Sequence, residues 1–242
     1  MTALRLVGHE FIEVEDEAER SSPPAASPPM DPEQKRAFVQ RLFTRIAPRY
    51  DWFNRLASFG LDKRWRREAL RRGGIASGQR ILDVCTGTGD LALLCAEQQA
   101  TGQVIGADRN AAMLLRAQQK QRLAPRPRLH WLQADAESLP LADASVDRVL
   151  IGFSTRNLSR LSTGLAEMVR VLRPQGRLII LETGYPRHPL LRMGYQFFLF
   201  TVARTIGWAL TGSAWPFTYL ARSVRDFLTP EQFMERLREL KT

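Results

Sequence analysis

The stretch that most constrains the fold of this chain joins an apolar strand, a glycine turn and a helix. It begins at residue 81 and reads Ile-Leu-Asp-Val-Cys-Thr-Gly-Thr-Gly-Asp. Gly87 and Gly89 follow the expected strand end at Val84, and the missing Cβ atoms permit a tight turn and close approach of the backbone to a ligand. The helix that starts near Asp90 directs free amides to the same place. We therefore expect a nucleotide-like cofactor there.

Charge at the glycine turn separates the candidate cofactors. The turn also fits the loose fingerprint of dinucleotide sites, with Asp108 on the next strand placed to hold ribose hydroxyls. Asp83 and Asp90 flank the turn, and their carboxylates would repel a pyrophosphate. S-adenosylmethionine has no phosphate, and its sulfonium and ammonium make the same acids favourable partners. The sequence thus favours a methyl donor over a nicotinamide, with a turn-capping role for Asp83 as the alternative.

Apolar runs alternate with helical patterns in the middle of the chain, which predicts a mostly parallel sheet covered by helices on both faces. The expected elements are strand Arg80–Val84, helix Asp90–Gln98, strand Gln103–Ala107, helix Ala111–Arg122, strand Arg128–Gln133, strand Val146–Ile151, helix Thr163–Leu172 and strand Arg177–Leu181. In such a sheet the ligand lies beyond the carboxyl ends of the strands. Those ends hold Asp83, Asp108, Asp135 and the segment 152–157.

Helical patterns flank the sheet on both sides. Asp31-Pro32-Glu33 is typical of a helix start and predicts a helix over Pro32–Ile46, and a second helical stretch, Asp62–Arg72, ends at two glycines. We expect a helical lid over residues 31–74, a cofactor-binding core over 75–182 and a C-terminal helical region over 183–242.

The segment Leu190–Leu210 is rich in large apolar side chains. It contains five aromatic residues, but two arginines make it a poor membrane-spanning helix. A core helix, a lipophilic substrate pocket and a bilayer interface all fit this composition.

Charge is unevenly distributed along the 242 residues, a length that suits one α/β domain with appendages. Residues 1–33 hold eight acids and two bases, and this acidic, Pro-rich composition predicts a disordered tail over residues 1–30. Between Lys35 and Arg72 there are twelve bases and three acids, close to the whole net charge of +10. A segment this basic is compatible with binding to a nucleic acid, with binding to an anionic membrane surface, or with a role in solubility alone.

Metal, redox and export signals are weak. Cys85 and Cys95 are spaced for neither a metal pair nor a redox motif, and the three histidines show no zinc or Ser-His-acid spacing. The first ten residues lack the pattern of a signal peptide. We expect reduced thiols, no metal and a cytoplasmic location.

With these motifs in place, the chain resembles the S-adenosylmethionine-dependent C-methyltransferases of ubiquinone and menaquinone biosynthesis. The match covers about residues 43–227. The motifs that carry it are Phe43-x-x-Ile46-Ala47-x-x-Tyr50-Asp51-x-x-Asn54, Trp65-Arg66, Leu82-Asp83-x-x-x-Gly87-Thr88-Gly89-Asp90, Gly106-x-Asp108, Asp135-Ala136-Glu137-x-Leu139-Pro140, Arg156-Asn157, Leu181-Glu182 and Tyr219-Leu220.

The resemblance implies a Rossmann-like class I methyltransferase fold that binds S-adenosylmethionine and methylates a carbon of a prenylated quinol ring. It implies that Thr88 and its neighbours contact the methionine moiety, that Asp108 contacts the ribose, and that Asp135 and Ala136 contact the adenine. The expected cofactor-binding residues are Asp83, Gly87, Thr88, Gly89, Asp108, Arg109, Asp135 and Ala136.

Two departures from the family pattern bear on this reading. Gly152 stands where the family has a serine that contacts the cofactor, so that contact is not expected here. The family continues beyond a helix such as Pro230–Leu240 into two further strands, yet nothing after Leu181 reads as a strand. Either the chain is truncated, or the edge of its sheet is covered in another way.

Methylation of a quinol carbon needs a deprotonated neighbouring hydroxyl, held in position and stabilised by the protein. Our hypothesis is that Arg156 holds the developing phenolate, that Asn157 orients it, and that Tyr50 and Asp51 close the lid against water. A water or a carboxylate is favoured over imidazole as the base. The alternative for Arg156 is a structural ion pair at the strand end.

A prenylated substrate is insoluble, so we expect peripheral association with the cytoplasmic membrane through the segments 35–72 and 190–208. No nucleic acid is expected as a partner, while a homodimer or a quinone-biosynthesis complex is left open. Benzoquinol and naphthoquinol substrates cannot be told apart from short motifs. The rival functions are methylation of nucleic acid or of another lipophilic molecule, nicotinamide-dependent oxidoreduction, and a non-catalytic scaffold.

Overall fold

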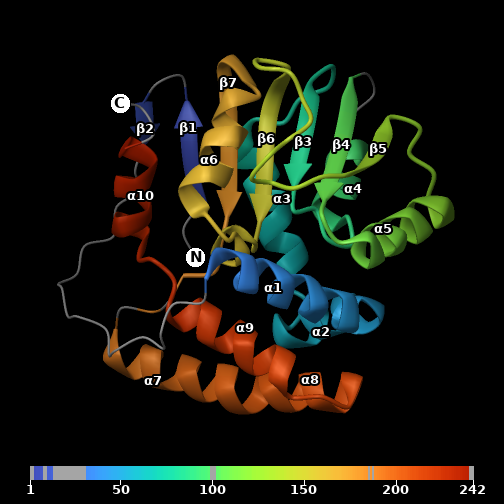
Figure 1. Cartoon of the computed structure of the whole chain (residues 1–242). Coiled ribbons are helices and arrows are strands. Elements are labelled where there is room, and N and C mark those ends of the chain that lie inside the picture. The colour runs from blue at the N-terminus through green and yellow to red at the C-terminus, as the bar shows by residue number, and fades with distance from the viewer. Residues whose placement is uncertain are drawn as a thin grey trace.

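The computed structural model describes residues 31–98, 102–184, 186 and 188–239, and the backbone of residues 3–7 and 10–12. A seven-stranded sheet with the order β2-β1-β7-β6-β3-β4-β5 forms its centre (Figure 1). The strands are β1 (Ala3–Val7), β2 (Glu10–Ile12), β3 (Arg80–Val84), β4 (Gln103–Asp108), β5 (Leu129–Gln133), β6 (Val146–Gly152) and β7 (Leu172–Leu181). Strands β3 to β7 are parallel, which confirms the prediction of a mostly parallel sheet.

The outer edge of β7 is covered by the N-terminal segment. Strand β1 pairs antiparallel with β7, with Ala3 opposite Leu181, and β2 pairs antiparallel with β1. No strand follows Leu181 in the described part of the C-terminal region. The prediction of disorder is therefore wrong for residues 3–7 and 10–12, because the short run Ala-Leu-Arg-Leu-Val is apolar although its surroundings are acidic. Residues 1, 2, 8, 9 and 13–30 lie outside the described residues.

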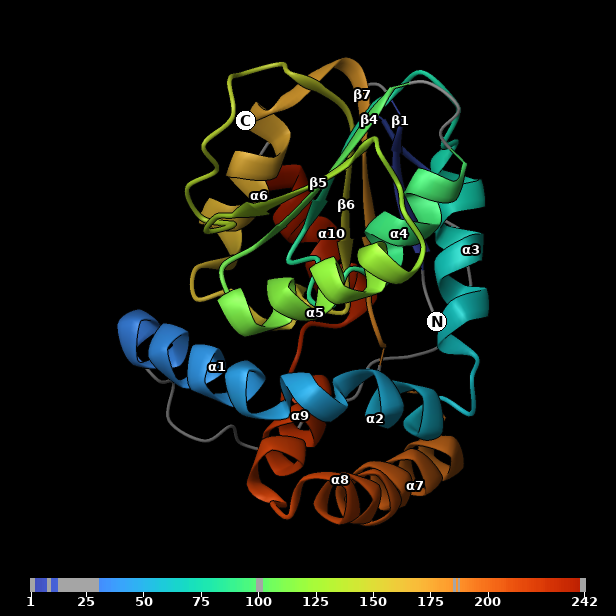
Figure 2. The same ribbon diagram turned by 90° about the vertical axis from the view of Figure 1, so that its right-hand side faces the viewer.

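Helices cover both faces of the sheet (Figure 2). On one face lie α3 (Asp62–Gly73) and α4 (Asp90–Glu97), whose buried side chains pack with those of β3 and β4. On the other face lie α6 (Leu161–Arg170) and α10 (Pro230–Glu239). The helix that we predicted over residues 163–172 starts and ends two residues earlier, and β7 begins at residue 172 instead of 177.

A layer of helices lies beyond the carboxyl ends of the parallel strands (Figure 1). It contains α1 (Pro32–Ile46), α2 (Tyr50–Ala57), α7 (Pro189–Phe197), α8 (Arg204–Thr211) and α9 (Trp215–Arg225), with α5 (Ala111–Leu123) between it and the sheet. This layer has its own core, which includes Leu42, Ile46, Phe53, Met113 and Phe217. Helix α2 was not predicted. The layer forms the floor of the crevice in which the site lies.

Helices α7 and α8 are joined by a π-helical segment, Phe198–Ala203, and present a largely exposed face. Of the residues in these three segments, Ala203 and Gly207 are buried, while Leu190, Leu191, Met193, Phe197 and Trp208 are 58–68% exposed. One side of the segment belongs to the core of this layer, through Ala203, Phe198, Ile206 and Leu210, so the prediction of a core helix holds for that side and not for the exposed one. No helix in the described ranges has the length and apolar character needed to cross a membrane.

Candidate active site

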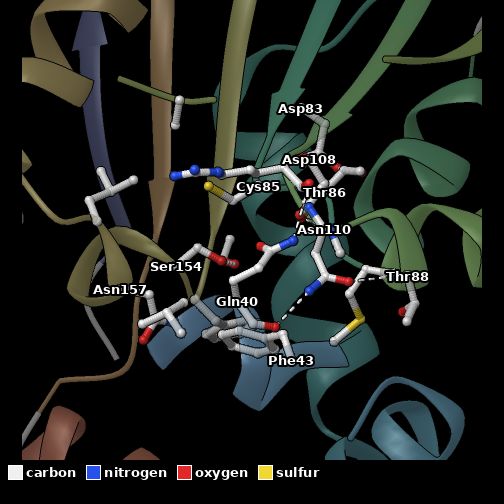
Figure 3. A pocket seen from close by; sticks show the side chains of 18 of the residues that line it. Gln40, Phe43, Asp83, Cys85, Thr86, Thr88, Asp108, Asn110, Ser154 and Asn157 are labelled. Atoms are coloured by element: carbon white, nitrogen blue, oxygen red, sulfur yellow. Dashed lines mark hydrogen bonds between the residues drawn. The ribbon is translucent and has the colours of Figure 1, made fainter. Parts of the chain in front are cut away.

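A cavity lies between the carboxyl edge of the sheet and helix α1 (Figure 3). It encloses about 1030 Å³, including the space at its open mouth. The glycine turn and the end of β4 form one wall, and the segment after β6 forms the opposite wall. The cavity is thus positioned at the crevice where the sequence predicted a ligand.

The glycine turn adopts a backbone that requires glycine. Gly87 has a φ of 58° and Gly89 a φ of 81°, both in the left-handed region. A Cβ on Gly87 would meet no atom within 4 Å, so the space above it is open to a ligand. A Cβ on Gly89 would lie 2.5 Å from the ring of Trp131, so Gly89 serves packing and does not line the cavity. Gly87 is therefore the glycine that a ligand approaches.

Asp108 closes the turn from the neighbouring strand. Its two carboxylate oxygens accept hydrogen bonds from the amides of Gly87, at 2.8 Å, and Asn110, at 2.7 Å. Burial raises the pKa of Asp108, although these amides favour its charged form. Asp108 therefore lies at the cavity wall with both oxygens already oriented.

Asp83 is buried beneath the turn. It is 1% exposed, lines the cavity and accepts a 2.6 Å hydrogen bond from the hydroxyl of Thr86. Burial raises its pKa to about 7. A cation bound beside Asp83 would favour its ionised form.

Asp90 also lines the cavity, but protein cations already compensate its charge. Lys120 Nζ lies 2.5 Å from Asp90 and Arg66 NH2 lies 3.7 Å from it. Burial opposes ionisation, yet these cations outweigh it and lower the pKa of Asp90. Asp90 is therefore ionised, and its charge is compensated within the protein.

The far end of the cavity contains the predicted adenine-binding residues. Asp135 and the buried Ala136 line the wall, and Arg109 NH1 lies 3.2 Å from Asp135 Oδ2. Arg36 of the lid reaches the same place, 3.7 Å from Asp135 and 2.7 Å from Glu137. The structure therefore brings Asp108, Asp135 and their neighbours to one wall.

Helix α1 closes the cavity through polar contacts. Lys35 Nζ donates to the carbonyl oxygens of Arg156, at 3.1 Å, and Leu158, at 2.6 Å. The buried amide of Asn110 donates to the Gln40 carbonyl at 3.0 Å, in the region shown in Figure 3. Lys35, Arg36 and Arg66 thus face inward, so the prediction that the whole basic segment 35–72 faces a membrane is wrong for them.

Helix α2 is tied to the glycine turn. Thr88 donates a 2.5 Å hydrogen bond to Asp51 Oδ1, and Lys120 Nζ lies 2.7 Å from Asp51 Oδ2. Tyr50 lines the cavity and packs edge-on against Phe43, with ring centroids 5.8 Å apart. Burial raises the pKa of Tyr50, which keeps its hydroxyl protonated. Asp51 is not one of the described residues that line the cavity, so it fastens the lid from outside.

The segment after β6 carries Arg156 and Asn157. Asn157 lines the cavity together with Ser154, across from the glycine turn (Figure 3). Arg156 is not among the described lining residues, and its guanidinium forms an ion pair with Glu182. Glu182 also accepts a 2.6 Å hydrogen bond from the Thr155 hydroxyl. The ion pair that we held as the alternative for Arg156 is therefore present, and Asn157 is the residue that faces the cavity.

Several lining residues were missed by sequence reasoning, namely Arg36, Val39, Gln40, Asn110, Met113 and Leu158. Asn110 follows the predicted strand end at Ala107 by three residues and caps the next helix, a signal that could have identified it. The lid residues carry no such signal, because their role depends on how α1 docks.

Known proteins resemble this chain over most of its length. The model of the ubiE/COQ5 methyltransferase family matches residues 30–240. A ubiquinone/menaquinone biosynthesis C-methyltransferase of Geotalea uraniireducens is 40% identical over 202 residues, 83% of this chain and 86% of that protein. A demethylmenaquinone methyltransferase of Deinococcus radiodurans is 40% identical over 212 residues, 87% of this chain and 88% of that protein.

The fold also resembles that of solved structures. A SAM-dependent methyltransferase of Thermotoga maritima aligns with a TM-score of 0.58 and 19% identity, over 84% of this chain and 80% of that chain. At this level of identity the likeness concerns the fold alone. It supports the prediction of a Rossmann-like class I methyltransferase architecture.

Proposed function

Because the chain belongs to the ubiE/COQ5 methyltransferase family, we propose that it methylates a ring carbon of a prenylated quinol with S-adenosylmethionine as the methyl donor. The observation that carries the proposal is the two-sided cavity. Acidic side chains line one wall, and the amide of Asn157 faces them from the other. The acidic wall would attract a cationic methyl donor, and the amide on the other wall would donate to an ionising ring hydroxyl.

The cofactor side of the cavity fits S-adenosylmethionine. The open space above Gly87 would admit its methionine moiety, and the carboxylates of Asp83, Asp108 and Asp135 would attract its positive charges and its hydroxyls. Thr88 and Ala136 would complete the contacts. When bound, this cofactor supplies a methyl group whose former bonding pair stays on sulfur, while the ring carbon provides the electron pair of the new C–C bond.

The other side of the cavity fits an aromatic ring. Among the lining residues, Phe43, Tyr50, Phe153 and Leu158 supply apolar surface, and Asn157 and Ser154 supply polar groups. The ring hydroxyl loses its proton to water, and the side-chain amide of Asn157 stabilises the oxygen anion. After methylation the ring carbon loses its own proton, which restores the aromatic ring.

The activity test uses purified protein, radiolabelled S-adenosylmethionine and short-chain demethylquinols kept reduced. We expect a product heavier by one CH₂ unit, with the naphthoquinol and benzoquinol forms assayed in parallel to identify the ring. Asp108→Ala is expected to abolish cofactor binding and methyl transfer together. Binding of the cofactor without methylation of either quinol would support the non-catalytic scaffold instead.

We further propose that the layer farthest from the sheet docks on the cytoplasmic membrane, where the prenyl tail resides. An apolar face is formed there by Trp52, Leu56, Phe59, Leu61, Leu190, Leu191, Met193, Phe197 and Trp208, all at least 44% exposed. The rings of Phe59 and Phe198, 6.0 Å apart, connect its two halves. Exposed basic residues lie on the same or adjacent elements, namely Arg55, Lys63, Arg64, Arg67 and Arg204.

Vesicle co-sedimentation tests this docking. Binding to vesicles with anionic lipid is expected to weaken as salt rises, and the double change Leu191→Ser with Phe197→Ser should reduce it at least tenfold, because exposed apolar area drives insertion. Leu123→Ser is the matched control, since Leu123 is 89% exposed on α5, outside the apolar face. Binding that ignores salt, lipid charge and the double change would contradict the proposal.

A further inference from the structure

The side-chain amide of Asn157 has one occupied end and one free end. Its oxygen accepts a 3.3 Å hydrogen bond from the hydroxyl of Tyr219. Its Nδ2 atom is buried and has no hydrogen-bond partner among the described residues. An unpaired buried N–H group costs free energy unless a ligand satisfies it. Asn157 lines the cavity, so its unpaired amide group belongs to the wall that a bound molecule would contact.

Tyr219 comes from a distant part of the chain. It lies on α9, and its ring packs edge-on against Phe38 of α1, with centroids 4.9 Å apart. Phe38 also contacts Trp215, one turn earlier on α9, at 5.4 Å. These contacts hold α9 against the lid and fix where the Tyr219 hydroxyl lies. The C-terminal helical layer thus contributes a side chain to the segment that faces the cavity.

The protonation of Tyr219 decides which end of the amide turns toward it. Burial raises the pKa of the hydroxyl, and the nearby Arg156 only partly opposes this, so the phenol keeps its proton at neutral pH. A protonated phenol that donates its hydrogen bond attracts the amide oxygen, which leaves the NH₂ group turned away. Without this bond, the amide could rotate and present its oxygen to the cavity.

The backbone beside Asn157 is held independently of Tyr219. Glu182 pairs with Arg156 and accepts from the Thr155 amide at 3.1 Å, while Lys35 holds the Arg156 carbonyl. Removal of the Tyr219 hydroxyl should therefore free the amide while the segment stays in place.

We propose that Tyr219 is a positioning residue, which orients the Asn157 amide so that its Nδ2 donates to the ionising hydroxyl oxygen of the aromatic substrate. This inference rests on the proposed function and assigns the polar end of the same site. A donor fixed in advance stabilises the phenolate more than the neutral phenol, so it should increase turnover more than substrate affinity.

The first test measures the ionisation of a bound phenol and requires no methyl transfer. 4-Nitro-1-naphthol is titrated by its phenolate absorbance with the full chain and S-adenosylhomocysteine. Wild-type protein is expected to increase the phenolate fraction relative to water. Tyr219→Phe should weaken phenolate binding roughly three- to tenfold, and Asn157→Asp roughly a hundredfold, because a carboxylate repels the anion. Binding of the neutral phenol at low pH should change little.

Asn157→Asp is the second variant, and it preserves the acceptor for Tyr219 while removing the donor. Tyr195→Phe is the matched control, since it removes a tyrosine hydroxyl from α7 and should leave the titration unchanged. If Tyr219→Phe unfolds, Asn157→Asp still decides whether the amide donates. Unchanged phenolate binding in Asn157→Asp, or in a folded Tyr219→Phe, would overturn the proposal.

Kinetics with a short-chain quinol separate this inference from the function on which it rests. Tyr219→Phe is expected to lower kcat three- to tenfold and to shift the rising limb of its pH profile to higher pH, with little change in KM. A wild-type protein that methylates no quinol would overturn the proposed function and this inference with it. If the wild-type protein methylates a quinol and Tyr219→Phe has the same pH profile as wild type, this inference alone is overturned.

Discussion

Lys35 Nζ donates a 2.6 Å hydrogen bond to the carbonyl oxygen of Leu158, which fastens the lid helix to the segment that carries Arg156 and Asn157. The same ammonium donates to the Arg156 carbonyl at 3.1 Å. Burial lowers the pKa of Lys35, and Glu137 partly restores it. Lys35 therefore links closure of the cavity to the geometry of its substrate wall.

Lys35→Met should uncouple the lid from this segment. The methionine retains the apolar stem but loses the charged donor, a change of about 1.5–3 kcal/mol that corresponds to a ten- to hundredfold loss in kcat/KM. Hydrogen exchange over residues 155–159 should become faster. Lys63→Met is the control, because Lys63 is exposed on α3. Equal activity of the two variants would show that the lid docks without Lys35.

Asp51→Asn should loosen the second attachment of the lid. Asp51 accepts from Thr88 and pairs with Lys120 at 2.7 Å, so removal of its charge leaves Lys120 with the Asp90 carboxylate and the Thr88 hydroxyl. We expect S-adenosylmethionine to dissociate about three- to tenfold faster, since Thr88 lies in the cofactor turn. Stopped-flow displacement measures this rate, with Asp226→Asn at the exposed end of α9 as control. An unchanged rate would contradict the attachment.

Cofactor affinity should depend on the ionisation of Asp83. Burial raises its pKa to about 7, so the carboxylate that attracts a cation forms as pH rises through neutrality. The Kd of S-adenosylmethionine, measured by calorimetry from pH 6 to 8, should fall and then level off. Asp83→Asn should weaken binding and flatten this dependence. A steep pH profile in Asp83→Asn would assign the titration to another group.

The titration of Asp83 also predicts how the free energy of unfolding depends on pH. The pKa of Asp83 is higher in the folded protein than the ordinary value of 3.8, so between that value and about 7 the folded state binds a proton that the unfolded chain releases. Its contribution to stability is therefore lost as pH rises through this interval. Urea denaturation across the interval should show a smaller decline for Asp83→Asn than for wild type.

The parallel sheet was predictable because each strand is a short apolar run bounded by turn residues. Strand β3 and helix α1 have the predicted bounds. Strand β1 was missed because its five residues border a strongly acidic segment, and average composition outweighed a local pattern. Its pairing with β7 depends on contacts between residues nearly 180 positions apart, and the local β-propensity of a sequence does not reveal such contacts.

The residues of the candidate site likewise fall into those that the sequence predicts and those that depend on long-range packing. Asp83, Asp108 and Asp135 were predictable because strand ends converge on one edge of a parallel sheet. The orientation of Arg156 toward Glu182, and that of Asn157 toward Tyr219, could not be predicted, because each depends on how separate segments pack. The sequence identified the correct segment, but it could not tell which of its two polar residues faces the cavity.

Gly207→Ala should destabilise the C-terminal helical layer. A Cβ at Gly207 would lie 2.1 Å from the ring of Phe217, which is 2% exposed and packs against Phe53. Overpacking of this kind costs about 1–3 kcal/mol, measurable by urea denaturation. Gly194→Ala is the control, since a Cβ there meets no atom within 4 Å and α7 should gain up to about 1 kcal/mol. A Gly207→Ala protein as stable as wild type would contradict the close approach of α8 and α9.

Deletion of residues 1–12 should expose the edge of β7. Strand β1 pairs antiparallel with β7 from Ala3 to Arg5, and its loss leaves the backbone donors and acceptors on that edge of β7 without their partners. Such an edge favours pairing with other chains, so we expect a lower Tm and aggregation that increases with protein concentration. The control carries Arg5→Pro, which removes one backbone donor of β1 and should give a smaller effect in the same direction. If the deleted protein matches the full chain in Tm and stays monomeric by light scattering, the N-terminal strands do not complete the sheet in solution.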